Sequence, residues 1–201
     1  MAKNSMKKDV LEPGGIYHFY NKGNNKEDIF IEERNYSYFL QLVKKYLLPI
    51  SEIYAYCLLK NHFHLALKIR ENHELPEKYK DKVHLPFSNL FNTYTKSVNK
   101  AYDRFGSLFQ EHPQRNRVED EDYLRQLIVY IHLNPLKHNF TNDFTTYRHS
   151  SYNSFLLEKQ TSLERNYILE LFGGKDNFVH FHNENSIRYE GFINVIDIFD
   201  V

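Results

Sequence analysis

Two histidines separated by a single residue are the first feature of this chain that could do chemistry. Hydrophobic and polar residues alternate over residues 62–70 (HFHLALKIR), a pattern typical of a β-strand with one buried face. The alternation places His62 and His64 together on one face, at a spacing that suits two imidazole ligands of one metal ion. The opposite face carries the apolar residues, which are Phe63, Leu65, Leu67 and Ile69.

The spacing of the histidines is weak evidence when taken alone. With 11 His in 201 residues, about 0.6 His-x-His triplets are expected by chance. A second triplet, His180-Phe181-His182, does occur. No clean alternation surrounds that copy, so we interpret it as coincidental. A histidine on a sheet face is more often structural than a ligand, but the strand context favours His62 and His64.

A tyrosine and an asparagine one helical turn apart form a second candidate group. Residues 120–133 have helical periodicity and begin with acidic side chains, which suit a helix N-terminus. An advance of 100° per residue places Tyr130 and Asn134 side by side, next to the buried stripe. That helix edge would present a phenol, which can act as a nucleophile, together with an amide oxygen. Because the chain contains 16 Tyr, any single tyrosine is usually a packing residue.

The elements around these residues predict the fold. We expect strands at 16–20, 52–59, 62–70 and 114–118. We expect one helix at 35–48, a second that begins with a cap at Ser88 and ends at about Phe105, and a third at 120–133. Pro135 predicts a kink or a stop at the end of the third helix. This β-α-β-β-α-β order, followed by a helix, predicts an α+β fold. It is a ferredoxin-like antiparallel sheet with helices on one face, and the helix of Tyr130 lies near the open face. We assign residues 1–140 to this domain and residues 141–201 to a C-terminal extension, with a helix at 161–172.

Composition and charge narrow the class of protein. The sequence has no net charge, yet residues 1–138 hold 21 basic and 17 acidic residues whereas 139–201 hold 5 and 9. A weakly basic body with an acidic tail is compatible with nucleic-acid binding, although so small a split also arises by chance. The lone Cys57 excludes a disulfide framework. No apolar run is long enough for a membrane span, and no signal peptide opens the chain, so we expect no membrane partner and a cytoplasmic location.

Several cationic and amide side chains are candidates for contacts with nucleic acid, which requires cations for phosphates and aromatic rings for bases. Each cation, taken singly, is more often an ordinary solvated charge. The polar segment 21–25 is expected to be a loop. The candidates are Asn21, Lys22, Asn24, Lys68, Arg70, Lys96, Lys100, Arg115 and Arg117.

Four segments together resemble one known family. Asn61-His62-Phe63-His64-Leu65 resembles the HUH motif of the single-tyrosine transposases. Tyr130-Ile131-His132-Leu133-Asn134-Pro135 is similar to the tyrosine helix of their REP-associated branch. Weaker matches are Tyr17-His18 with the segment 21–24, and the segment 147–152 (YRHSSY). The matches occur in family order over residues 16–152.

The resemblance implies a metal-dependent endonuclease and strand transferase. His62 and His64 would bind Mg²⁺ or Mn²⁺. Asn134 would be the third ligand, although several relatives have Gln there, and His132 or His138 could compete for that role. Tyr130 would attack a phosphate of single-stranded DNA that carries a hairpin and form a 5′-phosphotyrosine, without a nucleotide cofactor. Both a monomer and a homodimer stay open.

Two other classes of function remain open alongside this one. A domesticated, non-catalytic module would bind nucleic-acid hairpins without cutting them. A metallohydrolase would use water instead of the tyrosine as its nucleophile. A covalent protein–DNA adduct distinguishes the transferase from both.

Overall fold

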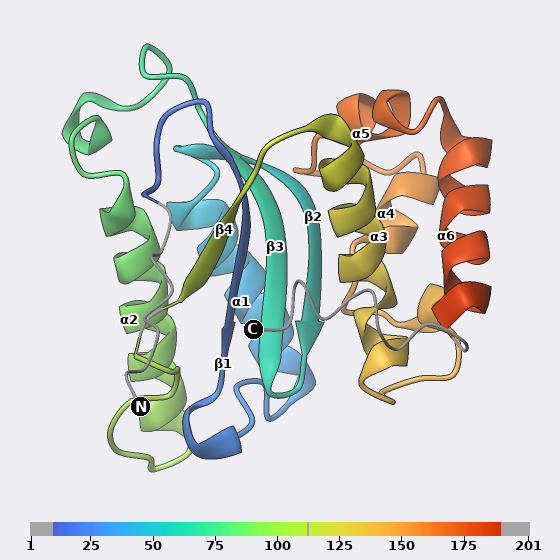
Figure 1. The fold of residues 1–201 in the computed structure, drawn as a ribbon. Helices are drawn as coiled ribbons and strands as arrows, with labels where there is room; N and C mark the ends of the chain where they lie inside the picture. Colours follow the sequence, from blue (N-terminus) through green and yellow to red (C-terminus); the bar gives the residue numbers. More distant parts are fainter. Residues whose placement is uncertain (1–9, 112, 190–201) are drawn as a thin grey trace, which may run out of the picture.

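A four-stranded antiparallel sheet forms the centre of the molecule (Figure 1). The computed structural model describes residues 10–111 and 113–189. The strands are β1 (Ile16–Lys22), β2 (Ser51–Leu59), β3 (His62–Ile69) and β4 (Gln114–Val118), and they lie in the order β2-β3-β1-β4. Every neighbouring pair is antiparallel. This is the expected ferredoxin-like arrangement, and the segment 21–25 differs from the expected loop because β1 continues to Lys22.

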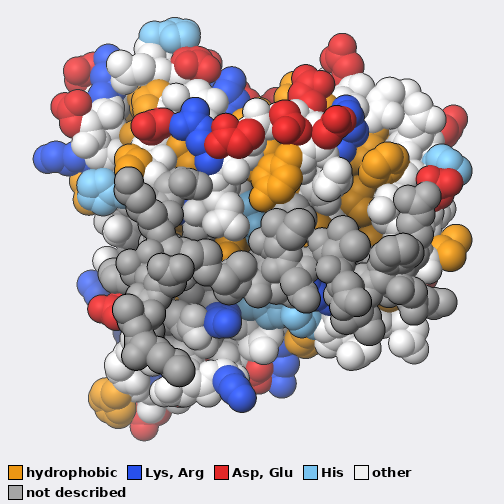
Figure 2. Space-filling model, viewed as in Figure 1, with side chains coloured by type: hydrophobic (Ala, Val, Ile, Leu, Met, Phe, Trp, Pro, Cys, Tyr) orange, Lys and Arg blue, Asp and Glu red, His pale blue; other side chains and the backbone are white. Residues whose placement is uncertain are grey.

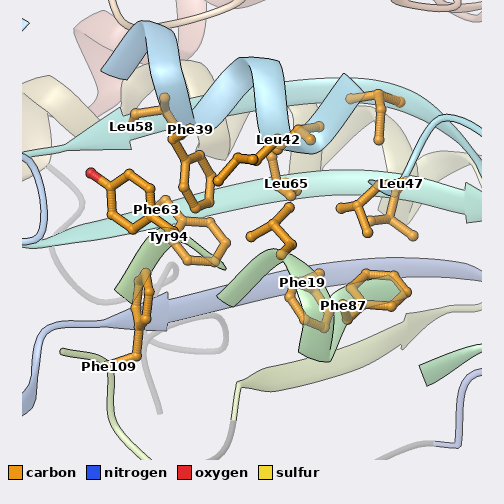
Figure 3. Close-up of a cluster of buried hydrophobic side chains, with 14 of the residues drawn as sticks. Phe19, Phe39, Leu42, Leu47, Leu58, Phe63, Leu65, Phe87, Tyr94 and Phe109 are labelled. Carbon is orange, nitrogen blue, oxygen red and sulfur yellow. The ribbon is translucent and has the colours of Figure 1, made fainter. Parts of the chain in front are cut away.

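One face of the sheet packs against α1 (Glu33–Tyr46) and α2 (His84–Ala101). The apolar residues of β3 point into this core, as their alternation predicts. Figure 3 shows the aromatic centre of the core, where Phe63, Phe39 and Tyr94 lie against one another. The buried hydroxyl of Tyr94 donates a hydrogen bond to the carbonyl oxygen of Ile29 (2.7 Å), so its polar end is satisfied.

The start of α2 differs from the prediction. The helix begins at His84, one turn before Ser88, and Ser88 donates its hydroxyl to the His84 carbonyl oxygen (3.3 Å) instead of capping the helix. Pro86 lies in the first turn, where a backbone N–H has no helical partner and its loss costs little. The helix ends at Ala101, four residues before the expected end at Phe105.

The other face carries α3 (Glu121–Lys137), which is the predicted helix of Tyr130. Asp120 caps its N-terminus by accepting a hydrogen bond from the Tyr123 amide (2.8 Å). The expected stop at Pro135 is wrong, since the helix continues through it to Lys137, whereas the expected kink stays a prediction. Pro135 removes only one hydrogen bond, close to the C-terminus, and its side chain is buried. Figure 1 shows α3 and α2 on opposite sides of the sheet.

The C-terminal segment packs outside α3. It contains α4 (Tyr152–Leu156), α5 (Arg165–Leu171), which is shorter than the expected helix, and α6 (Lys175–Tyr189). Three short 3₁₀ helices, Asn24–Lys26, Glu77–Tyr79 and Phe144–Thr146, lie in connections. Side chains of α4, α5 and α6 share a second buried cluster with α3. The boundary at residue 140 stays a prediction. Within the described chain, every helix is too short or too polar to cross a membrane.

A buried chain of hydrogen bonds ties α6 to α3 and to the sheet. The carbonyl oxygen of Phe178 can only accept, so His182 donates to it through Nδ1 (2.7 Å). His182 Nε2 then accepts from His132 Nδ1 (2.9 Å), and His132 Nε2 accepts from the Ser151 hydroxyl (2.8 Å). The second His-x-His triplet is thus split, because His182 is buried in this chain while His180 lies outside and pairs with Glu184 (3.4 Å).

Candidate metal and nucleophile site

The two candidate histidine ligands lie on the face of the sheet that α3 covers. The register places Lys22 opposite His62 and Tyr20 opposite His64. The rings of His62 and His64 have centroids 5.2 Å apart and are nearly perpendicular. The alternation of β3 therefore produces the predicted imidazole pair.

The tyrosine helix brings its phenol to the same place. The Tyr130 ring contacts the His64 ring edge-on, with centroids 5.5 Å apart. The Lys137 ammonium lies 5.4 Å from the centre of the Tyr130 ring. These contacts lie within one chain, so a second copy is not required to unite the imidazole pair with a tyrosine. The homodimer remains a prediction.

Asn134 is the third member of the predicted group, and it lies beside His62. Its side chain raises the pKa of His62, against the larger effect of burial. Its amide nitrogen donates to the Tyr130 carbonyl oxygen (3.2 Å), which leaves the amide oxygen for another partner. Asn134 is fully buried, so this oxygen is held near the imidazoles instead of facing bulk water.

The protonation state of His62 suits a metal ligand, because the ring is neutral and one nitrogen carries a lone pair. Its Nδ1 lies 2.7 Å from the Asn61 side-chain oxygen, which can only accept, so the ring proton is on Nδ1 and the lone pair is on Nε2. Burial, together with the smaller effects of positive charge on His138, Lys22 and Lys137, lowers the pKa of His62 to about 3. Burial likewise lowers the pKa of His64 well below its usual value. Both rings are therefore neutral at pH 7.

The unsatisfied polar atoms fit a cation. His62 Nε2, His64 Nε2 and Asn134 Oδ1 are buried and have no hydrogen-bond partner among the described residues. Buried polar atoms are rarely left without a partner, and these are two imidazole nitrogens and an amide oxygen, all of them donor atoms for divalent metals. No cluster of three His, Cys, Asp or Glu side chains suited to a metal occurs in residues 10–111 and 113–189. Asn134 Oδ1, as a buried oxygen without a hydrogen-bond partner among the described residues, is therefore the candidate for a third protein ligand.

His132 and His138, which could compete with Asn134 for the role of third ligand, have different positions. His132 uses both ring nitrogens in the buried chain with His182 and Ser151, so it is not available to the site. His138, at the C-terminal end of α3, lies beside His62 with ring centroids 4.6 Å apart. His138 is at the exposed rim of the site.

The structure brings only some of the predicted nucleic-acid contacts to this face. Lys22 and Lys68 share it with the histidines, and Lys68 pairs with Glu71 (3.4 Å). Arg70 lies at the end of β3 and pairs with Glu52 (3.5 Å). Asn24 begins the 3₁₀ helix that follows β1. Figure 2 shows acidic and basic side chains interspersed along the upper rim of the visible face.

The other predicted contacts lie away from the histidines. Lys96 and Lys100 are exposed on α2, beyond the opposite face of the sheet. Arg115 and Arg117 pair with the core residues Phe19 and Tyr17, and so point to the α2 side. Asn21 is buried on that side and donates to the Gln110 carbonyl oxygen (3.3 Å). These five residues are thus separated from the imidazole pair by the sheet.

Sequence reasoning did not assign His18, Tyr20 or Lys137 to the site, although Tyr17-His18 is one of the weaker family matches. His18 Nε2 lies 2.9 Å from His64 Nδ1, and both side chains are buried. Tyr20 stacks on His18, with ring centroids 4.5 Å apart. Alternation within β1 could have placed His18 and Tyr20 on one face, but no local signal shows that β1 pairs with β3.

The buried histidines make the metal-free protein sensitive to acid. Burial lowers the pKa of His18 to about 3 and that of His182 to about 4, whereas the unfolded chain has the usual value near 6.5. Between these values the unfolded state binds protons that the folded state does not. The free energy of unfolding is therefore greatest above about pH 6.5. As the pH is lowered below this value, it decreases by up to about 1.4 kcal/mol per pH unit for each histidine.

Urea unfolding at pH 7.5, 6.5 and 5.5 with EDTA measures this loss. The variant His182→Gln should reduce the slope by up to about 1.4 kcal/mol per unit. A free energy of unfolding that is unchanged between pH 7.5 and 5.5 would contradict the assignment of neutral buried imidazoles.

Comparison with solved structures finds a similar fold in a REP-associated tyrosine transposase bound to a REP hairpin. The TM-score is 0.59 and the identity is 14%, over 76% of this chain and 85% of the other. No protein-family model matches the sequence, and no curated protein matches it. The structural likeness agrees with the resemblance carried by the sequence motifs, and the chain has the fold of a REP-associated tyrosine transposase.

Proposed function

We propose that the protein is a metal-dependent endonuclease and strand transferase for single-stranded DNA, a transposase that acts through a 5′-phosphotyrosine. The observation that carries the proposal is the meeting of His62, His64 and Tyr130 at one place in the chain. Packing alone does not explain why Tyr130 lies beside two neutral imidazoles and an amide oxygen that leave buried polar atoms without a hydrogen-bond partner among the described residues.

His62, His64 and Asn134 would hold Mg²⁺ or Mn²⁺. Imidazole nitrogens favour Mn²⁺ somewhat, while the amide oxygen accepts either ion. When bound, the ion supplies positive charge to a phosphate oxygen in the transition state. The chain itself contributes the Lys22 and Lys137 ammonium groups, which would attract a phosphate. Both charges lower the pKa of His62, and that of Lys137 also lowers the pKa of His64.

Tyr130 supplies the nucleophile. Its phenolic oxygen forms a bond to phosphorus as the bond from phosphorus to the 3′-oxygen breaks. The phenolic proton passes to solvent, and the leaving 3′-oxygen takes up a proton. The products are a 5′-phosphotyrosine and a free 3′-OH. Because the phosphodiester bond energy is retained, attack by another 3′-OH rejoins DNA without a nucleotide cofactor.

We assign hairpin-containing DNA as the substrate because the transposase of similar fold is bound to a REP hairpin. The alternative is a non-catalytic module that binds hairpins. The burial of Tyr130, which is 2% exposed, favours this alternative, because a phosphate must reach the phenol for any reaction to occur.

Covalent capture separates these functions. The purified chain is incubated with labelled oligonucleotides, each a stable hairpin flanked by randomised single-stranded segments, and Mn²⁺. We expect a protein–DNA adduct that survives SDS, retains the 5′ side of the downstream strand and is absent with EDTA. Retarded DNA without cleavage would support the binding module, and cleavage without an adduct would support a hydrolase.

A further inference from the structure

The imidazole of His18 is buried at the centre of the proposed site, where its ring lies against the rings of His64 and Tyr130. His18 is on β1, the strand that pairs with β3, and it is fully buried. Its Nε2 lies 2.9 Å from Nδ1 of His64, and the two rings are nearly parallel, at 19°. This contact joins the two strands through their side chains, in addition to the backbone ladder.

Two neutral imidazoles that share a hydrogen bond hold one proton between them, and there are two ways to place it. If His18 donates, His64 keeps its own proton on Nε2 and cannot bind a metal through that atom. If His64 donates from Nδ1, its Nε2 carries a lone pair. Only the second arrangement makes His64 a ligand through the buried atom that has no hydrogen-bond partner among the described residues.

We propose that His18 is a positioning residue, whose Nε2 accepts the Nδ1 proton of His64 and so selects the ligand tautomer of His64. The inference rests on the proposed metal-dependent function. Metal-binding histidines commonly donate their second nitrogen to a carboxylate or a carbonyl. Here a neutral ring takes that role, so it orients His64 without adding negative charge beside the phosphate that the site would bind.

The surroundings hold the acceptor in place. Tyr20 stacks on the His18 ring at 4.5 Å and 24°, and its ring also lies nearly parallel to that of His64, at 5.6 Å. His18 lies edge-on to Tyr130, with centroids 5.8 Å apart. One side chain thus contacts the ring of a metal ligand and the ring of the nucleophile, and its loss would loosen both. His62 obtains the same tautomer control from Asn61, so each ligand has its own acceptor.

The experiment measures Mn²⁺ affinity of the full chain without DNA, by titration followed by EPR. His18→Phe keeps a ring but removes the acceptor, and we expect affinity to fall about 10–100-fold. His18→Gln offers an amide oxygen to the His64 Nδ1 proton and should recover most of the loss. The matched control is His182→Phe, which removes a buried histidine pair with the same 2.9 Å separation but away from the site, and it should bind Mn²⁺ like the parent.

Nitrogen NMR of the parent saturated with Mg²⁺ supplies a readout that does not depend on variants. We expect the His64 proton on Nδ1. A proton on Nε2, equal Mn²⁺ affinity of the parent and His18→Phe, or an equal loss in His18→Phe and His182→Phe would overturn the role of His18. A parent that binds no Mn²⁺ at all would overturn the metal-dependent function as well, so the two failures are distinguishable.

Discussion

Replacement of Tyr130 with phenylalanine is expected to abolish the covalent adduct, reducing its rate by on the order of 10³-fold or more, because the attacking oxygen is gone. The ring contacts with His64 and Lys137 need no hydroxyl, so the fold and hairpin binding should persist. The adduct is measured on denaturing gels with labelled hairpin DNA.

A second tyrosine of α3 provides the matched control. Tyr123 is seven residues before Tyr130, which places it about 10 Å away along the helix. Tyr123→Phe should keep adduct formation within a few-fold of the parent. DNA cleavage that persists in Tyr130→Phe and releases a free 5′-phosphate would show that water is the nucleophile.

Loss of one imidazole ligand is the second change with a large expected effect. In His64→Ala, Mn²⁺ affinity should fall by at least about 100-fold, and adduct formation should fall below detection. The ion would lose one of its two imidazole ligands, and no described cluster of three His, Cys, Asp or Glu could replace the site. Calorimetric titration with Mn²⁺ and the adduct assay measure the two effects.

The control for His64→Ala is His180→Ala, from the exposed position of the second His-x-His triplet. It should change neither metal affinity nor adduct formation. Cleavage that is equally fast in His64→Ala, or that continues in excess EDTA, would exclude the metal-dependent account.

The imidazole pair and the tyrosine–asparagine pair could be predicted because each depends on local periodicity. The two-residue repeat of a strand fixes the relation of His62 to His64, and the helical repeat fixes that of Tyr130 to Asn134. The buried side of β3 was also predictable, since its apolar residues all enter one core. The meeting of the two pairs was not a local property, and it was expected only from the resemblance to a family.

His18 and the cationic contacts could not be predicted, because they depend on pairing between distant strands. Nothing in residues 16–22 shows that His18 will lie across from β3, or that Arg115 on β4 will face the α2 side. The alternation of a strand shows which residues share a face, but it does not show whether that face is the one covered by α2 or the one covered by α3. The helix of Lys96 and Lys100 could similarly have covered either face.

The helix ends near two prolines were predicted incorrectly for a different reason. Pro86 lies in the first turn of α2, where proline removes no helical hydrogen bond. Pro135 lies near the end of α3, where it removes only one. Proline therefore marks the proximity of a helix end in both cases, without fixing the residue at which the helix begins or stops.

The most direct test of the central claim is a crystal structure of the full chain with Mn²⁺, in which anomalous scattering locates the ion. The account predicts one Mn²⁺ coordinated by Nε2 of both His62 and His64, with the Tyr130 hydroxyl of the same chain or of a partner facing the same ion. Manganese bound elsewhere, or bound to one imidazole with the Tyr130 hydroxyl turned away, would contradict it.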